Sequence, residues 1–175
     1  MGDGWTDSKL KLTEIQLLDL VDVATREGEI PVLYSYAKEL ADDWPVVRTA
    51  ADTLVAEGLI KGNASHSGSP APFLTPAGKA LVLERAELRS DARRRAVACR
   101  DALLDWTYAN NARGIDDFAG EIRAHFEGDP FTKEEIVAAA RDLVEKDYLR
   151  VAWHRPQITA AGKTVVEAYG SSIGS

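Results

Sequence analysis

The sequence has only one cysteine, Cys99, and only one methionine, at position 1. A single cysteine cannot form an intrachain disulfide, and a free thiol fits the reducing cytoplasm. No apolar run approaches the roughly 18–20 residues that a transmembrane helix needs. The opening residues, MGDGWTDSK, lack the basic and apolar segments of a signal peptide. These absences predict a cytoplasmic protein that does not interact with a membrane.

The groupings typical of catalytic and metal sites are missing as well. The three histidines, His66, His125 and His154, lie far apart, whereas zinc ligands usually come in closely spaced pairs. The sequence contains no glycine-rich phosphate loop and no serine in a nucleophile-elbow context. We therefore expect no enzymatic activity, no metal and no cofactor. Cys99 stands in helical, partly apolar sequence and is interpreted as a small buried thiol.

Positive charge is scarce. The 175 residues include 21 Lys and Arg against 28 Asp and Glu, which gives a formal net charge of −7. Because nucleic-acid-binding proteins usually present a basic surface, this balance counts against DNA binding, although it leaves room for a local basic patch. With 45% hydrophobic and 28% charged residues, the composition is that of an ordinary globular protein. The length suits one medium domain or two small ones.

An internal repeat is what the sequence does contain. Residues 54–61 read LVAEGLIK, and residues 143–150 read LVEKDYLR. Each is followed by a loop, shorter in the second copy, and then by LTPAGKALV at 74–82 or ITAAGKTVV at 158–166. In both copies this order fits the end of a helix, a strand, a loop, a second strand and the start of a new helix. The repeat predicts two domains of one type in tandem.

Apolar periodicity places the elements of the first copy. Helices are expected at about 10–28, 31–40 and 46–57, with apolar residues at three- and four-residue spacing on one face of each. Gly58 is expected to end the third helix, because glycine readily adopts the left-handed conformation that follows a helix. Two strands, near 59–61 and 73–75, flank the polar loop GNASHSGSPAP.

A long helix is expected to connect the two copies. It begins at Pro76 and continues toward Asn110, too long for one domain, so residues 76–110 are interpreted as a shared connector. A bend is expected near Ser90–Asp91, where helix propensity is lower. The predicted domains are residues 10–90 and 91–170, with flexible tails at 1–9 and 171–175. The fold class is mainly α with small β-hairpins, an α+β fold.

The second copy is predicted to repeat the pattern of the first. Aligning core positions between the copies predicts a second helix over 115–122, followed by a turn at Gly128–Pro130. Thr132 and Glu135 form a capping box at the start of a third helix, 133–147. A hairpin at 148–153 and 157–159 and a terminal helix at 160–169 complete the copy.

The segments DTLVAEGLI (52–60) and LTPAGKAL (74–81) resemble winged-helix repressors of the multiple-antibiotic-resistance and PadR types. The resemblance implies two tandem winged-helix domains. In such repressors the third helix enters the major groove of DNA and the hairpin, or wing, lies along the backbone. It therefore implies a DNA-binding transcriptional regulator that is dimeric or works with a partner. The matching residues, such as Gly58, Gly78 and Gly162, are mostly structural, and the same fold also serves proteins that do not bind DNA.

The candidate DNA contacts lie on the first copy's third helix, on both hairpins and on an arginine stripe of the connector. They are Arg48, Thr49, Thr53, Lys61, Asn63, His66, Arg85, Arg89, Arg93, Arg150 and Arg155. The stripe follows a nucleic-acid backbone, docks an acidic partner, or is simply a solvated helix face. The third helix of the second copy carries Glu134 and Glu145, whose carboxylates would be repelled by phosphates, so it is expected to read DNA poorly.

A protein-interaction module is the alternative function. Acidic tandem winged helices resemble the "kite" subunits of chromosome-organising SMC complexes, which bind a kleisin segment. In this interpretation the apolar residues Val151, Trp153 and Ile158 of the second hairpin form the partner-binding surface. A continuous positive band along Arg48, Lys61 and the Arg85–Arg93 stripe would favour DNA, whereas an apolar groove ringed by acidic residues would favour a partner peptide.

Overall fold

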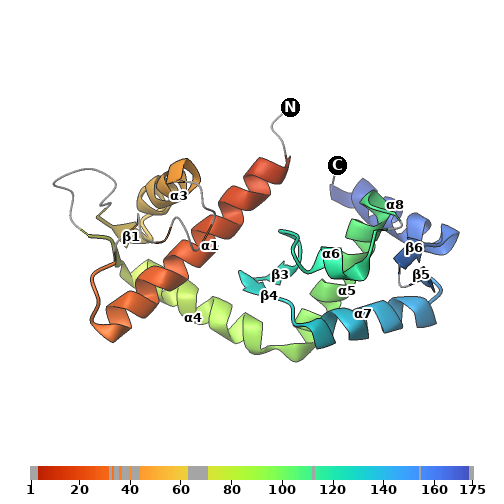
Figure 1. Cartoon of the computed structure of the whole chain (residues 1–175). Coiled ribbons are helices and arrows are strands. Elements are labelled where there is room, and N and C mark those ends of the chain that lie inside the picture. The colour runs from red at the N-terminus through yellow and green to blue at the C-terminus, as the bar shows by residue number, and fades with distance from the viewer. Residues whose placement is uncertain are drawn as a thin grey trace. The chain divides into compact units, whose positions relative to one another are not determined.

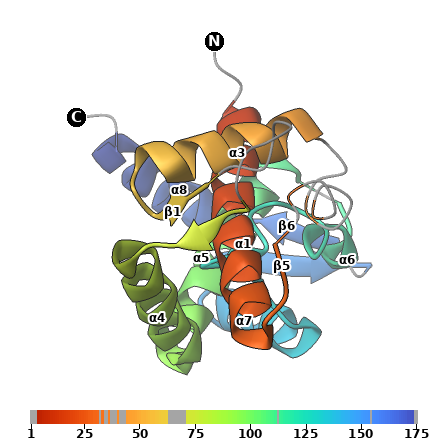
Figure 2. The ribbon, with the colours of Figure 1, turned by 90° about the vertical axis from the view of Figure 1, so that its left-hand side faces the viewer.

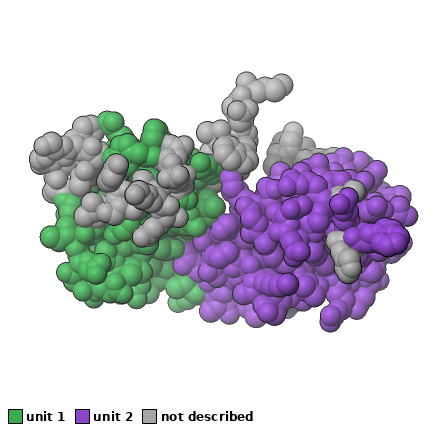
Figure 3. Space-filling view, in the orientation of Figure 1, with its two compact units in different colours: residues 1–88 green, residues 89–175 purple. Residues whose placement is uncertain are grey.

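The computed structural model (Figure 1) describes residues 4–31, 33, 36, 40, 44–62, 71–111, 113–153 and 155–173. Over these residues the chain is mainly helical, with three small antiparallel strand pairs, which confirms the α+β part of the prediction. The chain divides into two compact units, residues 1–88 and 89–175 (Figure 3). In the part of the chain that is described, no helix is long and apolar enough to cross a membrane.

Unit 1 is built on helix α1 (Gly4–Glu27) and helix α3 (Trp44–Ala56), which pack against each other (Figure 2). The short strands β1 (Ile60–Lys61) and β2 (Phe73–Leu74) close one side of their core. Apolar residues at helical spacing face inward, as the periodicity predicts. The buried core residues are Leu17, Leu18, Val21, Leu33, Ala50, Ala51, Leu54, Ile60 and Leu74.

The start of α1 and the end of α3 can be compared directly with the predicted helix boundaries. Helix α1 begins at Gly4, earlier than predicted, because residues 5–27 contain neither proline nor glycine to interrupt it. Gly58 has a φ of 71° and follows α3, so its predicted role at the helix end is confirmed. Of the helix expected over 31–40, residues 31, 33, 36 and 40 are described; Pro31 is not helical and the other three are.

The connector consists of two helices, α4 (Pro76–Ser90) and α5 (Ala92–Ala109), which are separated at the position where a bend was expected. Asp91 lies between them in an extended conformation, and its carboxylate accepts a hydrogen bond from the Arg94 backbone N at 3.0 Å. This is the geometry of an N-cap, in which a side chain satisfies a donor at the start of a new helix. Asp91 therefore starts α5 instead of continuing α4.

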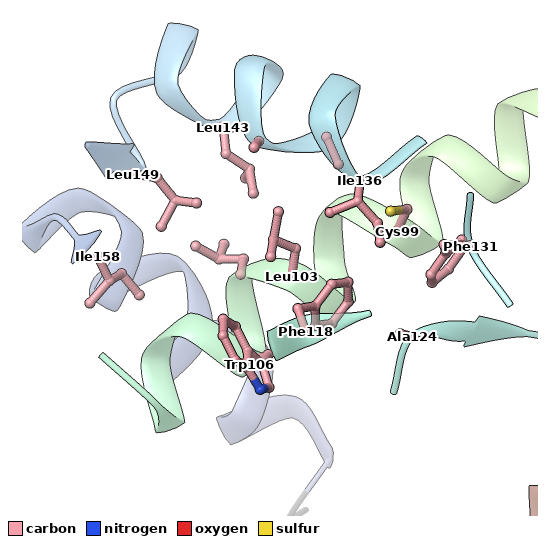
Figure 4. Close-up of a cluster of buried hydrophobic side chains, with 13 residues drawn as sticks. Cys99, Leu103, Trp106, Phe118, Ala124, Phe131, Ile136, Leu143, Leu149 and Ile158 are labelled. Carbon is pink, nitrogen blue, oxygen red and sulfur yellow. The ribbon is translucent and has the colours of Figure 1, made fainter. Parts of the chain in front are cut away.

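Unit 2 forms around α5, against which helix α7 (Lys133–Glu145) packs (Figure 4). Its other long elements are strands β5 (Leu149–Ala152) and β6 (Arg155–Ile158) and helix α8 (Ala160–Ile173). The rings of Trp106 and Phe118 lie 5.6 Å apart within its core. The buried core residues are Cys99, Leu103, Leu104, Trp106, Phe118, Ala124, Phe131, Ile136, Ala139, Ala140, Leu143, Leu149 and Ile158.

The prediction for residues 115–122 is only partly correct. Helix α6 covers only Ile115–Phe118, and a hairpin follows it, with strands β3 (His125–Phe126) and β4 (Asp129–Pro130). Its two turn residues, Glu127 and Gly128, both have positive φ, at 49° and 82°. Two positive φ values are typical of the tight turn that matches the twist of paired strands. The segment expected to be a simple turn at 128–130 is thus half of a hairpin.

The internal repeat is visible in the hydrogen bonds. Thr75 Oγ1 donates to a carbonyl before β1 and accepts from the Gly78 backbone N at 3.1 Å. Thr159 Oγ1 makes the same pair of bonds before β5 and at Gly162, with 3.0 Å to the glycine N. A Cβ on either glycine would overlap the carbonyl oxygen of the residue before the first strand. Both copies therefore need a hydroxyl side chain and a glycine at these positions.

Candidate nucleic-acid and partner interface

The β5–β6 hairpin brings two predicted contact residues onto one face. Leu149 pairs with Ile158 and both are buried, so this side of the hairpin faces the core. Successive side chains on a strand point to opposite faces. Arg150 is next to the buried Leu149 in β5, and Arg155 lies three positions before the buried Ile158 in β6. Both spacings are odd, so both arginines lie on the solvent face. Both are exposed, and as diagonal cross-strand neighbours they form a local cationic patch.

The arginine at the base of this patch is held in place. Arg150 Nε donates to Oε1 of Gln157, its cross-strand partner, at 3.0 Å. That bond uses one of the five N–H donors of the guanidinium group. The remaining donors face the same solvent side as Arg155, in an arrangement suited to phosphate oxygens or to carboxylates.

The tip of the hairpin carries an exposed tryptophan. The side chain of Trp153 is 94% exposed, and its φ of 55° lies in the left-handed region that bulky residues rarely adopt. The neighbouring Val151 is 56% exposed. Leaving a large apolar side chain in water forgoes about 2 kcal/mol of burial energy. Trp153 is therefore a strong candidate for contact with another molecule.

The third predicted partner residue of this hairpin does not share that surface. Ile158 is 8% exposed and belongs to the core of unit 2. The strand register explains the difference, because Ile158 is paired with the buried Leu149 whereas Val151 lies nearer the turn. Ile158 thus supports the hairpin from inside and cannot contact a partner in this fold.

On α3, the predicted reading residues offer few donors. Arg48 and Thr49 are exposed and Thr53 is half-buried. The Thr49 hydroxyl donates to the Pro45 carbonyl at 2.8 Å, and the Thr53 hydroxyl donates to the Thr49 carbonyl at 3.0 Å. Hydroxyls bound to their own helix in this way can only accept from a ligand. Arg48 is the basic residue that α3 presents.

In the first hairpin, the predicted contacts are described only in part. Lys61 is exposed on β1. Asn63 and His66 lie outside the described residues. Among the described residues of unit 1, the predicted DNA contacts that are both basic and exposed are therefore Arg48 and Lys61.

The predicted arginine stripe does not form one exposed band. Arg85 is only 8% exposed. Arg89 is half-buried and donates from Nε to the carbonyl of Glu127 at 2.8 Å, which holds the turn of the β3–β4 hairpin. Arg93 is exposed, and the N-cap at Asp91 separates it from the other two. Of the three, Arg93 is the one available to a phosphate.

The exposed face of α7 mixes charges of both signs. Lys133 and Arg141 alternate with Glu134 and Glu145, and all four are exposed. The start of the helix has the predicted capping box, with Glu135 N bonded to Thr132 Oγ1 at 3.2 Å. On the exposed face of α7, Glu134 and Glu145 would lie close to any phosphate that Lys133 or Arg141 could reach.

An ion cluster around the buried Arg95 in unit 2 was not predicted. Arg95 binds Glu135 through Nε and NH2, at 2.7 and 2.9 Å, and binds Asp129 at 2.7 Å. Its guanidinium also lies over the Phe131 ring, 5.7 Å from the centroid. The hydrogen bond from Arg95 lowers the pKa of the Glu135 carboxyl below its ordinary value. The cluster joins α5, the β3–β4 hairpin and α7, so its role is structural.

The single thiol matches its predicted environment. Cys99 is fully buried in the unit 2 core, and burial raises its pKa to about 12. A thiol with this pKa is protonated at neutral pH and is a poor nucleophile. In the described ranges, no group of three or more His, Cys, Asp or Glu could hold a metal ion.

Two grooves flank α5 within unit 2. The larger, of about 680 Å³, lies between α5 and α7 and has a lining of alanines with Val97. Its charges are partly paired internally, since Arg100 NH1 lies 3.2 Å from Asp142 Oδ2. The smaller, of about 200 Å³, lies between α5 and α8. Sequence reasoning identified neither, because each is formed by two helices that are far apart along the chain.

No protein-family model, curated protein sequence or solved structure matches this chain. Its function is therefore inferred from its own side chains.

Proposed function

We propose that this chain is a cytoplasmic tandem winged-helix protein that binds double-stranded DNA as a transcriptional regulator, with the β5–β6 hairpin as its main contact. The observation that carries the proposal is the placement of Arg150 and Arg155 on one solvent face of that hairpin. Two guanidinium groups on a hairpin anchored in the core can follow a phosphate backbone without reordering the fold.

The equivalent hydrogen bonds of the two units support the winged-helix part of the proposal. In each unit a helix, α3 or α7, is followed by a strand pair and then by a helix that begins with the threonine–glycine arrangement. In this interpretation β1–β2 and β5–β6 are the two wings. Arg48 and Lys61 then add cationic contacts from unit 1, and α7 contributes little because Glu134 and Glu145 repel phosphates.

A salt titration tests the proposal. Binding of a labelled duplex would be followed by fluorescence anisotropy between about 50 and 200 mM salt, where each phosphate contact contributes about 0.9 to the slope of log affinity against log salt. Arg150→Gln and Arg155→Gln should each reduce the slope by about 1, with little effect on sequence preference. Arg94→Gln is the matched control, since Arg94 is exposed but lies outside the hairpin.

Two outcomes would overturn the DNA proposal. One is no detectable binding at about 50 mM salt, the condition that most favours phosphate contacts. The other is an equal loss in the Arg94→Gln control, which would mean that net charge alone, and not the hairpin, governs the affinity.

A protein-interaction module, kite-like or an adaptor subunit, is the second candidate, and the exposure of Trp153 favours it. Exposed tryptophans flanked by apolar residues are common anchors of protein interfaces. Copurification of the full chain from its host, with nucleic acid and protein both measured, separates the two candidates. If Trp153→Ser abolishes a copurifying partner but leaves the salt slope unchanged, the hairpin tip binds protein. Sedimentation of the same samples tests whether the chain is a dimer.

A further inference from the structure

We propose that the groove between α5 and α8 docks a basic, amphipathic helix of a partner protein. Its lining residues are Asp101, Leu104 and Asp105 from α5 and Val165, Val166 and Tyr169 from α8. The groove lies within unit 2, away from the β5–β6 residues assigned to DNA, and the proposal does not depend on DNA binding.

The floor of the groove is apolar. Leu104 is 5% exposed and is part of the unit 2 core. Val165 and Val166 are half-buried and pack against the same core, while Tyr169 is 72% exposed. A partner side chain that enters here would meet a preformed apolar surface with an aromatic ring beside it, which lowers the cost of ordering on binding.

The α5 wall of the groove is acidic. Asp101 and Asp105 lie one turn apart on α5, and like charges at this spacing repel each other. Burial raises the pKa of the Asp105 carboxyl, Arg123 opposes that rise, and Asp101 adds to it. Asp101 shares its cation with another carboxylate, because Arg100 Nε lies 3.5 Å from Asp101 Oδ1 while Arg100 Nη1 lies 3.2 Å from Asp142 Oδ2. None of the groove's lining residues is cationic.

The C-terminal end of α5 adds no cation to the wall of the groove. The C-terminal end of a helix carries a partial negative charge, so carboxylates near it are unfavourable and cations favourable. Helix α5, which is described in full, has no basic residue in its last turn. One turn beyond Leu104, Tyr108 donates to Glu167 of α8 at 3.2 Å, which brings a third carboxylate to the same two helices. None of the residues that line the groove is a cation, so a cation from a partner would add a favourable contact for its two aspartates.

Charge and size together define the occupant. A groove of about 200 Å³ holds one or two side chains, so it suits an apolar anchor from a helix surface and not a whole helix. An arginine at three- or four-residue spacing from that anchor could reach Asp101 and Asp105 with bidentate hydrogen bonds, with its guanidinium over the Tyr169 ring. Phosphates are excluded, because the two carboxylates repel them.

A pair of synthetic helical peptides serves as the probe. The first has leucine on one face and arginine on the other, and the second replaces every arginine with glutamate. Calorimetric titration of the full chain should show binding of the arginine peptide only. Asp101→Asn with Asp105→Asn should weaken that binding by about tenfold or more, as loss of a partly desolvated charge pair does. Tyr169→Ala should weaken it as well without changing the net charge.

Glu134→Gln with Glu145→Gln on α7 is the matched control, because it changes the net charge equally and lies outside the groove. An equal loss in that control would overturn the proposal, since the peptide would then respond only to overall charge. Equal binding of the glutamate peptide would also overturn it. The wild-type chain could also form a dimer that is lost in the Asp101→Asn, Asp105→Asn variant. That result would assign the groove to a second copy instead.

Discussion

Gly162→Ala tests whether the close contact between α8 and the β5 segment holds unit 2 together. The new Cβ would overlap the carbonyl oxygen of Tyr148 and would lie 2.8 Å from Ile158 Cγ1. The oxygen belongs to the backbone and cannot rotate away, so α8 must shift. Overpacking of this kind costs about 1–3 kcal/mol.

Two further effects modify that estimate. The shift would strain the hydrogen bonds from Gly162 N to Thr159 Oγ1 and from Thr159 N to the Tyr148 carbonyl, both at 3.0 Å, and each is worth about 1 kcal/mol. Alanine is the better helix former by about 1 kcal/mol, which offsets part of the loss. The expected net loss in the free energy of unfolding is about 2 kcal/mol.

Urea denaturation followed by circular dichroism measures this loss. Gly120→Ala is the control, because a Cβ there would meet only the Asp117 carbonyl oxygen at 3.9 Å, an ordinary contact. Gly78→Ala should cause a similar loss in unit 1, where the equivalent Cβ overlaps the Leu59 carbonyl. If Gly162→Ala is as stable as the wild type, or if Gly120→Ala loses as much, the proposed contact does not limit the stability of unit 2.

Three further predictions concern the interior of unit 2. Cys99, with a pKa of about 12, should not react with a thiol reagent in the native protein near pH 8 but should react fully in urea. Glu135 has a folded pKa below its ordinary value of 4.5, so it contributes stability above that pH and loses it as pH falls through the lower folded value. Glu135→Gln should therefore flatten the acid side of the pH dependence of unfolding, measured by urea titrations at several pH values. Arg95→Met should cost about 2–3 kcal/mol in urea denaturation, because it leaves Glu135 without its cation. The control Arg94→Met, at an exposed residue, should change the unfolding free energy by no more than about 0.5 kcal/mol.

Local sequence signals determined much of the helical and hairpin structure. Gly58 ends a helix because it adopts positive φ readily, and Thr132 with Glu135 starts one because their side chains satisfy its first donors. The repeated threonine and glycine positions predict the same turn in both units, since only glycine fits beneath the carbonyl there. Each of these effects acts over a few residues, so the sequence alone is enough to predict it.

The tertiary structure decided which predicted contact residues reach solvent. Sequence spacing places Arg85, Arg89 and Arg93 in one stripe, yet Arg85 is buried and Arg89 binds a carbonyl 38 residues away. Arg150 and Arg155 were identified from the sequence, but only the strand register shows that they share a face.

The α5–α8 groove likewise combines side chains from helices that are far apart in the chain. Burial and pairing depend on neighbours brought together by folding, and local sequence carries no record of them.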